Sequence, residues 1–296
     1  MSFKSQHPYR YSIGVPVYNE EKNLESFIHS VAIQENFIFD EIFFIVSGCT
    51  DSSERVIQRC IGDDTRCRVL RQEKREGKSL AINAFLKEAK GEILILISAD
   101  TMLDKYCLSK VAGLFSDATV GMAGAHPIPF KNTCGITYLM NKVLWDLHHA
   151  LCLKKPKLGE LVAFRNIIKK IPFDIVADEA YIEALILKNG YSLCYTSDAL
   201  VYNRCPVTVK DFFWQRMRIF WGHLDVKKKV NYAVASMDKG LLLGVVVRYC
   251  VKNFHTVVII TILCVLELLS RTVALCCYYC MRKIFPYMYI WSKYNK

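Results

Sequence analysis

Short apolar runs alternate with amphipathic stretches along most of the chain, starting near Tyr11. The apolar runs predict strands, and apolar residues spaced three and four apart predict helices packed on a sheet. This alternation is typical of a layered α/β domain. The predicted strands cover residues 12–17, 41–46, 68–70, 93–97, 120–125 and 161–164, and the predicted helices cover residues 20–33, 52–61, 79–89, 136–151, 178–187 and 209–223.

The end of the chain has a different pattern, because apolar residues dominate residues 241–280. Residues 254–269 include eleven Leu, Ile, Val or Phe side chains, which together favour membrane insertion by about 3 to 7 kcal/mol. Glu267 opposes insertion by about 3 kcal/mol at a bilayer centre, and Arg271 can pair with it across one helical turn. Residues 253–281 therefore predict one tilted membrane span. A helical hairpin and a buried core helix of a soluble enzyme are the alternatives.

Composition narrows the possible classes of protein. The chain has 296 residues, 52% of them hydrophobic, and its 39 Lys and Arg against 28 Asp and Glu give a net charge of +11. The apolar content excludes disorder. The basic excess fits an anionic membrane surface or a phosphate-bearing substrate, and no nucleic-acid partner is predicted because no binding module is recognisable. Thirteen cysteines without zinc-site spacing, after a polar N-terminus, predict reduced thiols.

Polar residues follow several predicted strands. Residues 93–97 are an unbroken apolar run, which indicates a strand covered on both faces, and Asp100 comes just after it. Ligands of open α/β sheets bind at the carboxyl ends of strands, so Asp100 is a candidate for a cation that bridges phosphates. Lys78, at a helix start, is a candidate for neutralising a phosphate. Asn19 and Asp51 also follow strands, where helix capping is an equally good interpretation.

In this order the segments resemble a known family. PVYNEE, then SGCTDSS after a strand, then EGKSLAINAFLKEAKGEILILISAD are similar to the nucleotide-binding half of family-2 glycosyltransferases with the GT-A fold. The resemblance covers about residues 12–224. It implies an α/β fold with a Rossmann-like mixed sheet flanked by helices, and sugar transfer from a nucleotide-diphosphate donor with inversion at the anomeric carbon. The donor-binding residues that it implies are Pro16, Tyr18, Asn19, Glu20, Asp51, Lys78, Ser98 and Asp100.

Two departures from the family pattern concern the metal and the nucleoside. Ser98 occupies the first carboxylate position of the D-x-D motif, and residues 46–49 lack the usual early carboxylates. Asp100 remains as the predicted metal-binding residue. Mg²⁺ commonly uses one or two protein carboxylates together with substrate phosphates, so the predicted cofactor is a divalent cation, Mg²⁺ or Mn²⁺.

The acceptor half contains an acidic pair, Asp178 and Glu179, at a predicted helix start. An acidic first turn that complements the helix dipole is the structural interpretation. An inverting transfer needs a base for the acceptor hydroxyl, and the resemblance implies that this pair supplies it. Asp178 is the predicted base, and Glu179 is the second candidate.

A second acceptor-side segment begins at Gln215 and resembles the Q-x-x-R-W motif of membrane-linked members, with Ile219 in place of the tryptophan. Arginine bonds two phosphate oxygens at once, so Arg216 or Arg218 is predicted to hold the diphosphate, and Trp221 is a further candidate on this side. A basic aromatic helix lying on an anionic membrane is the other interpretation, and the two are compatible.

The predicted catalytic domain covers residues 1–226, with a nucleotide-binding half at about 11–125 and an acceptor half at about 126–226. Residues 227–240 predict a basic linker, and residues 241–296 predict a membrane-associated helical region. The predicted protein is anchored at the cell membrane by its C-terminal helices, with a cytosolic catalytic domain and a lipid-linked or glycan acceptor. A nucleotidyltransferase of related fold is one alternative. A catalytically inactive membrane adaptor is another, motivated by the missing carboxylates.

Overall fold

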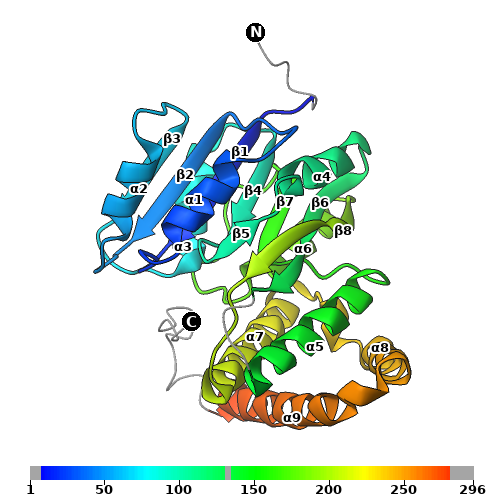
Figure 1. Cartoon of the computed structure of the whole chain (residues 1–296). Helices are drawn as coiled ribbons and strands as arrows, with labels where there is room; N and C mark the ends of the chain where they lie inside the picture. The colour runs from blue at the N-terminus through cyan, green and yellow to red at the C-terminus, as the bar shows by residue number, and fades with distance from the viewer. Residues whose placement is uncertain (1–7, 131–134, 281–296) are drawn as a thin grey trace.

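The computed structural model describes residues 8–130 and 135–280, which are built around one eight-stranded mixed sheet (Figure 1). Its strands are β1 (Tyr11–Val17), β2 (Glu41–Ser47), β3 (Cys67–Gln72), β4 (Ile93–Ile97), β5 (Thr101–Leu103), β6 (Val120–Pro129), β7 (Leu161–Arg165) and β8 (Ser192–Asn203). Their order in the sheet is β3-β2-β1-β4-β7-β6-β8-β5. The first four are parallel, whereas β7 runs antiparallel to both β4 and β6. β8 is parallel to β6, and β5 is antiparallel to β8.

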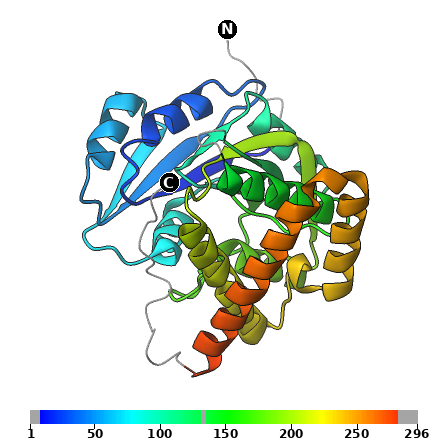
Figure 2. The same ribbon diagram turned by 60° about the horizontal axis from the view of Figure 1, so that its bottom comes forward.

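Helices cover both faces of the sheet. The helices α1 (Leu24–Ala32), α2 (Ser53–Ile61) and α4 (Cys107–Gly113) pack on one face, and α3 (Lys78–Glu88) and α6 (Asp178–Lys188) pack on the other. The remaining helices are α5 (Ile136–Cys152), α7 (Val209–Val230), α8 (Lys239–Lys252) and α9 (Val257–Cys280). They gather below one edge of the sheet, as Figures 1 and 2 show.

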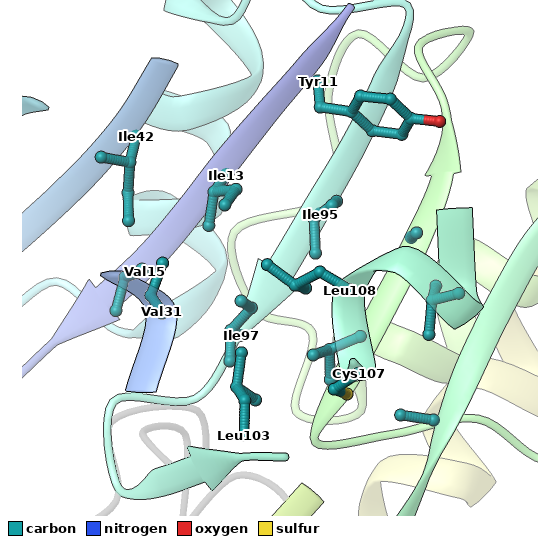
Figure 3. Packing of buried hydrophobic residues seen from close by; sticks show 14 of the residues in the cluster. Tyr11, Ile13, Val15, Val31, Ile42, Ile95, Ile97, Leu103, Cys107 and Leu108 are labelled. Carbon is teal, nitrogen blue, oxygen red and sulfur yellow. The ribbon is translucent and has the colours of Figure 1, made fainter. Parts of the chain in front are cut away.

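The strand at residues 93–97 is buried on both sides, as its unbroken apolar run predicts. Ile95 and Ile97 of β4 point into the apolar layer beneath α1 and α4 (Figure 3). Leu94 and Leu96 point the other way, into the layer beneath α3 and α6. Because fully burying one such side chain contributes about 1.5 to 3 kcal/mol, this strand anchors both layers and holds the loop that follows it.

Most predicted elements are confirmed to within two residues, and the larger differences have local causes. The helix predicted at residues 20–33 begins only at Leu24, because Asn19 has a left-handed backbone (φ 52°) and the chain turns before the helix. The strand predicted at residues 120–125 continues to Pro129 as β6. β5 and α4 are too short to give a clear sequence pattern. β8 was missed because polar residues interrupt it near an irregularity opposite β6.

The prediction of a linker from residue 227 is wrong at its start, because α7 continues through the lysine run to Val230. Lys229 lies 2.6 Å from Asp174 and 2.9 Å from Asp225, so it braces the helix against the segment before α6. The connection between α7 and α8 is therefore confined to residues 231–238.

The C-terminal helices pack on the rest of the protein. Ile260 of α9 shares an apolar cluster with Met140 of α5 and Phe212 of α7, and Figure 2 shows α9 crossing α7. Within the described ranges, one helix, Phe254–Cys280, is long and apolar enough to cross a bilayer. Length and composition alone support that possibility. Residues 281–296, which belong to the predicted membrane region, lie outside the described residues.

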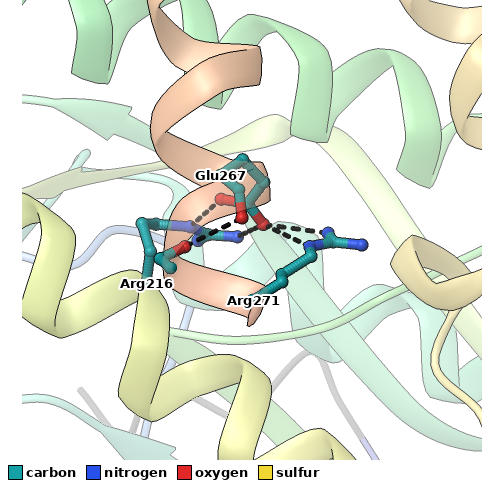
Figure 4. Close-up of polar contacts among 4 residues, drawn as sticks. Arg216, Glu267 and Arg271 are labelled. Atoms are coloured by element: carbon teal, nitrogen blue, oxygen red, sulfur yellow. Dashed lines mark hydrogen bonds and ion pairs between the residues drawn. The ribbon is translucent and has the colours of Figure 1, made fainter. Parts of the chain in front are cut away.

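An ion cluster joins α7 to α9 (Figure 4). Arg216 donates from Nε and Nη2 to the two carboxylate oxygens of Glu267 at 2.8 and 3.0 Å, and Arg271 donates from Nε to Glu267 at 2.9 Å. The predicted pairing of Glu267 with Arg271 is confirmed. Arg216 was predicted as a diphosphate ligand, but in this structure Glu267 occupies the fork of its guanidinium group.

Replacing Glu267 with leucine is expected to lower the free energy of unfolding by about 3 kcal/mol, because two largely buried guanidinium groups lose their counter-charge. The double variant Arg216→Met/Glu267→Leu should recover part of this loss, since it removes one of the uncompensated charges. Lys142→Met, which breaks an exposed ion pair with Asp146, is the control and should cost less than about 0.5 kcal/mol. Denaturant unfolding in detergent measures all three, and a similar cost for Glu267→Leu and Lys142→Met would contradict the prediction.

Candidate active site

A cleft of about 660 Å³ brings together most of the sequence candidates. Its walls come from the segments after β1 and β4, the first turns of α3 and α6, and the helices α5, α7, α8 and α9. Residues from both predicted halves therefore face one cavity. The candidates that line it are Pro16, Tyr18, Glu20, Lys78, Ser98, Asp100, Asp178, Glu179, Gln215, Arg216 and Arg218.

Lys78 contacts both acids of the predicted base pair. Its Nζ lies 2.8 Å from Asp178 Oδ2 and 2.6 Å from Glu179 Oε1. The two helix starts are held together next to this contact, because Ser79 Oγ donates to the carbonyl of Ile175 at 2.6 Å. Lys78 was predicted to face donor phosphates. In this structure its ammonium group fixes the positions of the two carboxylates.

Burial and local charge move the pKa values of this group apart. Burial, together with the charge of Glu179, raises the pKa of Asp178 to about 6 even though Lys78 opposes the change. Burial also acts against the ionised form of Glu179, but the Lys78 ammonium outweighs it and lowers the pKa of Glu179. Burial alone would lower the pKa of Lys78, yet the two carboxylates raise it. Asp178 thus combines an ionised state at neutral pH with a pKa suited to accepting a proton.

Asp100 lines the same cleft from the end of β4 and is only 7% exposed. The amide of neighbouring Ser98 donates to the carbonyl of Glu160 at 3.1 Å, which joins the end of β4 to the start of β7. Within residues 8–130 and 135–280, no three His, Cys, Asp or Glu side chains gather closely enough to hold a metal by themselves. A single carboxylate on the cleft wall fits a cation whose other ligands are substrate phosphates and water.

Asn19 and Asp51 do not line the cleft; they connect two loops. The side chain of Asn19 accepts from the Thr50 amide at 2.8 Å and donates to its hydroxyl at 3.1 Å. Asp51 accepts from the amides of Glu21 and Ser53 at 3.2 and 2.9 Å. The residues at the N-caps of α1 and α2 are instead Asn23 and Ser52. Asn19 and Asp51 therefore hold the two loops together, and their direct contacts with a nucleoside stay a prediction.

A stacked pair of residues at the cleft was not found from the sequence. The guanidinium carbon of Arg75 lies 3.8 Å from the ring centre of Tyr18, and both residues line the cavity. The backbone of Arg75 passes close to Gly48, where a Cβ would fall 2.4 Å from the backbone nitrogen of Arg75. Glycine also permits the φ of +59° at this position. The two residues offer a planar, positively charged surface next to the donor-binding candidates.

The candidates of α7 lie on two faces of the helix. Gln215 and Arg218 line the cleft, and the buried Nε of Arg218 has no hydrogen-bond acceptor among the described residues. Trp221 is buried instead against α9, with its ring centre 5.1 Å from that of Tyr278 in an edge-to-face contact. Trp221 therefore holds α9 on α7 and lies behind the wall of the cleft.

Several ionisable residues of the cleft were not among the sequence candidates, and for two of them the reason is strand direction. Glu160 and Lys157 precede β7, and the rule that ligands bind where parallel strands end overlooks the start of an antiparallel strand. Glu160 has a left-handed backbone (φ 60°), which is uncommon for this residue type and concentrates at functional sites. His148 and His223 also line the cleft, and burial lowers the pKa of both well below the usual range, so both are neutral.

Glu183, a buried acid of the cleft, gives the protein a pH-dependent stability. It accepts from the Leu158 amide at 2.5 Å and from the Tyr232 hydroxyl at 2.9 Å. Burial raises the pKa of Glu183 from 4.5 to about 7. Because the folded-state pKa is the higher one, the contribution of Glu183 to stability is complete below pH 4.5 and is lost as the pH rises through about 7.

Replacing Glu183 with glutamine should remove the loss of stability that the protein shows as the pH rises through about 7. Glutamine keeps the shape, can still accept from Leu158 and can donate to the oxygen of Tyr232. We expect the variant to exceed the parent protein by roughly 2 kcal/mol at pH 8 and to show little gain near pH 4.5. Unfolding curves at both pH values test this expectation, and an equal difference at the two would contradict it.

Comparison with known proteins identifies the family of the chain. Residues 12–174, more than half of the chain, match the family model described as glycosyl transferase family 2. The chain belongs to that family. The curated glycosyltransferase GlyG of Streptococcus pneumoniae serotype 4 is 30% identical over 92 residues, which are 31% of this chain and 30% of that relative. The match thus spans about a third of the curated relative.

Solved structures show that this family-2 glycosyltransferase has the GT-A fold that the sequence predicts. The mannosyltransferase PcManGT of Pyrobaculum calidifontis, in complex with GDP-Man and Mn²⁺, matches with a TM-score of 0.63 and 19% identity over 97% of this chain and 86% of its own. The likeness therefore extends over α8 and α9. S. aureus TarS 1–349 in complex with UDP has a TM-score of 0.52 and 16% identity, covering 83% of this chain and 74% of its own. Glucosyl-3-phosphoglycerate synthase from Mycobacterium tuberculosis, with Mn²⁺, UDP and phosphoglyceric acid, has a TM-score of 0.53 and 16% identity, covering 74% and 78%.

Proposed function

We propose that this family-2 glycosyltransferase moves a sugar from a nucleotide-diphosphate donor to an acceptor hydroxyl, with inversion at the anomeric carbon. The observation that carries the proposal is the shared cleft, where Asp100 at the end of β4 and the Lys78-bridged pair of Asp178 and Glu179 face one cavity. Such a transfer needs two functions side by side. One is a group that binds the departing diphosphate, and the other is a base for the incoming hydroxyl.

Donor binding is assigned to the β1 and β4 side of the cleft. Tyr18 and Arg75 form a flat surface for the nucleoside, and Asp100 would hold a divalent cation between the phosphates and the protein. That cation would supply charge neutralisation for the leaving diphosphate. The GDP-Man and Mn²⁺ bound by PcManGT, and the UDP and Mn²⁺ bound by glucosyl-3-phosphoglycerate synthase, support this assignment. Arg218 suits the same diphosphate, because its buried Nε has no hydrogen-bond acceptor within residues 8–130 and 135–280.

Asp178 is proposed as the base, with Glu179 as its neighbour in the acidic pair that Lys78 bridges. The acceptor hydroxyl gives its proton to a carboxylate oxygen of Asp178 while its oxygen bonds to the anomeric carbon. The bond from that carbon to the phosphate oxygen breaks, and the nucleoside diphosphate leaves with the electron pair. Glu179 remains ionised because Lys78 lowers its pKa, so its charge helps to keep Asp178 ready to take up the proton.

The acceptor and the membrane attachment are proposed from the C-terminal helices. Helix Phe254–Cys280 is apolar enough for a membrane anchor, and α8 and α9 also supply part of the cleft wall. A lipid-linked or membrane-bound glycan acceptor at the cytosolic face would reach Asp178 from that side. The catalytic domain would then be cytosolic, where nucleotide sugars are available.

Incubation of the full chain with a panel of nucleotide sugars, Mn²⁺ or Mg²⁺ and a membrane lipid extract tests the proposal. The expected products are a glycosylated lipid and a nucleoside diphosphate. Release of pyrophosphate from a nucleoside triphosphate would instead identify a nucleotidyltransferase. Absence of any turnover together with absence of metal-dependent nucleotide binding would support an inactive adaptor.

A further inference from the structure

Lys157 is a positively charged side chain on the wall of the cleft. Of the other cations that line the cleft, Lys78, Arg216 and Arg271 make ion pairs with carboxylates. Arg75 stacks on Tyr18, and Arg218 is assigned to the donor diphosphate. Lys157 makes no ion pair or side-chain hydrogen bond with any residue in 8–130 or 135–280. The nearby carboxylate of Glu183 is occupied by the Leu158 amide and the Tyr232 hydroxyl.

The surroundings of Lys157 make an added anion favourable. Burial and the charge of Arg216 lower the pKa of Lys157, and the opposing charges of Glu183 and Glu179 do not fully compensate for them. His148 and His223 are neutral, so they add no positive charge beside Lys157 that would repel it. An anion placed in direct contact with Lys157 would add a close ion pair, which the more distant charges of Glu183 and Glu179 do not form among the described residues.

The cleft also has apolar walls from the helices α5, α8 and α9, which Figure 2 shows grouped together. Leu147 of α5 packs in both clusters that join α5 to α8 and α9. Apolar side chains here would contact a hydrocarbon and offer nothing to a sugar hydroxyl. The apolar residues that line this part of the cleft are Leu147, Leu151, Leu242, Val246, Leu263 and Leu268.

This apolar wall continues onto the outer surface of the protein. Leu268 lines the cleft and is also largely exposed. The outer face of α8 and the start of α9 add further exposed apolar side chains, and basic residues stand on the same helix. Clustered exposed apolar residues with nearby cations fit an anionic membrane surface. The exposed apolar residues are Leu243, Val247, Val251, Phe254 and Val258, and the basic residues are Lys239, Arg248 and Lys252.

We propose that the acceptor is an anionic membrane lipid that carries both a phosphate and a hydroxyl group. Its hydrocarbon chain lies along the walls formed by α5, α8 and α9 and continues into the bilayer, its phosphate pairs with Lys157, and its hydroxyl faces Asp178. This inference rests on the proposed function, and it specifies the acceptor class of that same cleft.

Tryptophan quenching in the full chain tests the site without requiring turnover. Trp145 lines the cleft, whereas Trp214 does not. A brominated long-chain alkyl phosphate, added in mixed detergent micelles, should quench the fluorescence of the parent protein and of Trp214→Phe. The quenching should be largely lost in Trp145→Phe. The matching brominated alcohol, which has no charge, should bind at least tenfold more weakly than the phosphate.

Lys157→Met should weaken binding of the alkyl phosphate at least tenfold and leave binding of the alcohol unchanged. Lys154→Met, at an exposed site outside the cleft, is the matched control and should bind both probes like the parent. Equal affinity for phosphate and alcohol, or quenching that persists in Trp145→Phe, would overturn the inference. Calorimetric titration with nucleoside diphosphate and Mn²⁺ in the same preparations tests the proposed function separately. Nucleotide binding without phosphate-selective quenching would reject only the acceptor class.

Discussion

Replacing Asp178 with asparagine is expected to slow sugar transfer by about 10² to 10⁴-fold, the usual contribution of a general base. Asparagine keeps the shape of the side chain but cannot accept the proton of the acceptor hydroxyl. Donor affinity should change little, because the nucleotide is assigned to the β1 and β4 side of the cleft. Initial rates with saturating donor, together with calorimetric binding of the nucleoside diphosphate, measure the two effects separately.

The pH dependence gives this prediction a second readout. Because the pKa of Asp178 is raised to about 6, the transfer rate of the parent protein should fall as the pH drops through about 6 and the carboxylate becomes protonated. The rate of Asp178→Asn should not show this fall at acidic pH. Asp174→Asn, which breaks an ion pair with Lys229 away from the cleft, should keep the parent profile. Near-normal activity of Asp178→Asn would mean that the acceptor nucleophile is already ionised, and it would remove the base role.

Replacing Asp100 with asparagine should abolish metal-dependent binding of the donor. The amide keeps one oxygen but loses the charge that a hard divalent cation requires, and no group of three His, Cys, Asp or Glu side chains among the described residues could hold the metal in its place. We expect the affinity for nucleoside diphosphate with Mn²⁺ to fall at least tenfold and the transfer rate to fall at least 100-fold, since metal-assisted charge stabilisation supplies several kcal/mol.

Chelation provides the internal comparison for Asp100. Adding EDTA to the parent protein should reproduce the binding defect of Asp100→Asn, and EDTA should have no further effect on the variant. Asp63→Asn, at an exposed site between α2 and β3, is the matched control and should remain metal-responsive. If EDTA still weakened nucleotide binding to Asp100→Asn to the same degree as in the parent, the metal would have to be held elsewhere.

The donor side of the cleft could be predicted from the sequence because its residues follow parallel strands. The apolar run of β4 fixes a doubly buried strand, and the next polar residues must then lie at the edge of the sheet, which is where Asp100 lies. Asp178 and Glu179 were predicted because they are adjacent and open a helix. Their bridge to Lys78 joins residues about 100 positions apart, and no local pattern indicates such a contact.

The acceptor side could not be predicted because its residues meet only through tertiary packing. Lys157 precedes β7, which is antiparallel to its neighbours, so it reaches the cleft from the start of a strand. The rule that ligands bind where parallel strands end does not cover that position. The sequence predicts only Arg271 as a partner of Glu267, and Arg216 looked like a phosphate ligand rather than a second partner of Glu267. Only the crossing of α7 and α9 shows that they neutralise each other.

The position of β5 has a consequence for folding. Asp100 is fixed on one side by β4 and on the other by β5, and within the described residues β5 pairs only with β8, with Thr101 opposite Asn203. About 100 residues must therefore be synthesised before β5 finds its partner, and contacts so distant in sequence form slowly. The carboxylate assigned to the metal is made early in translation but can be positioned only after β8 has emerged from the ribosome. A nascent chain that stops before β8 should have its first strands in place and still fail to bind a nucleotide sugar.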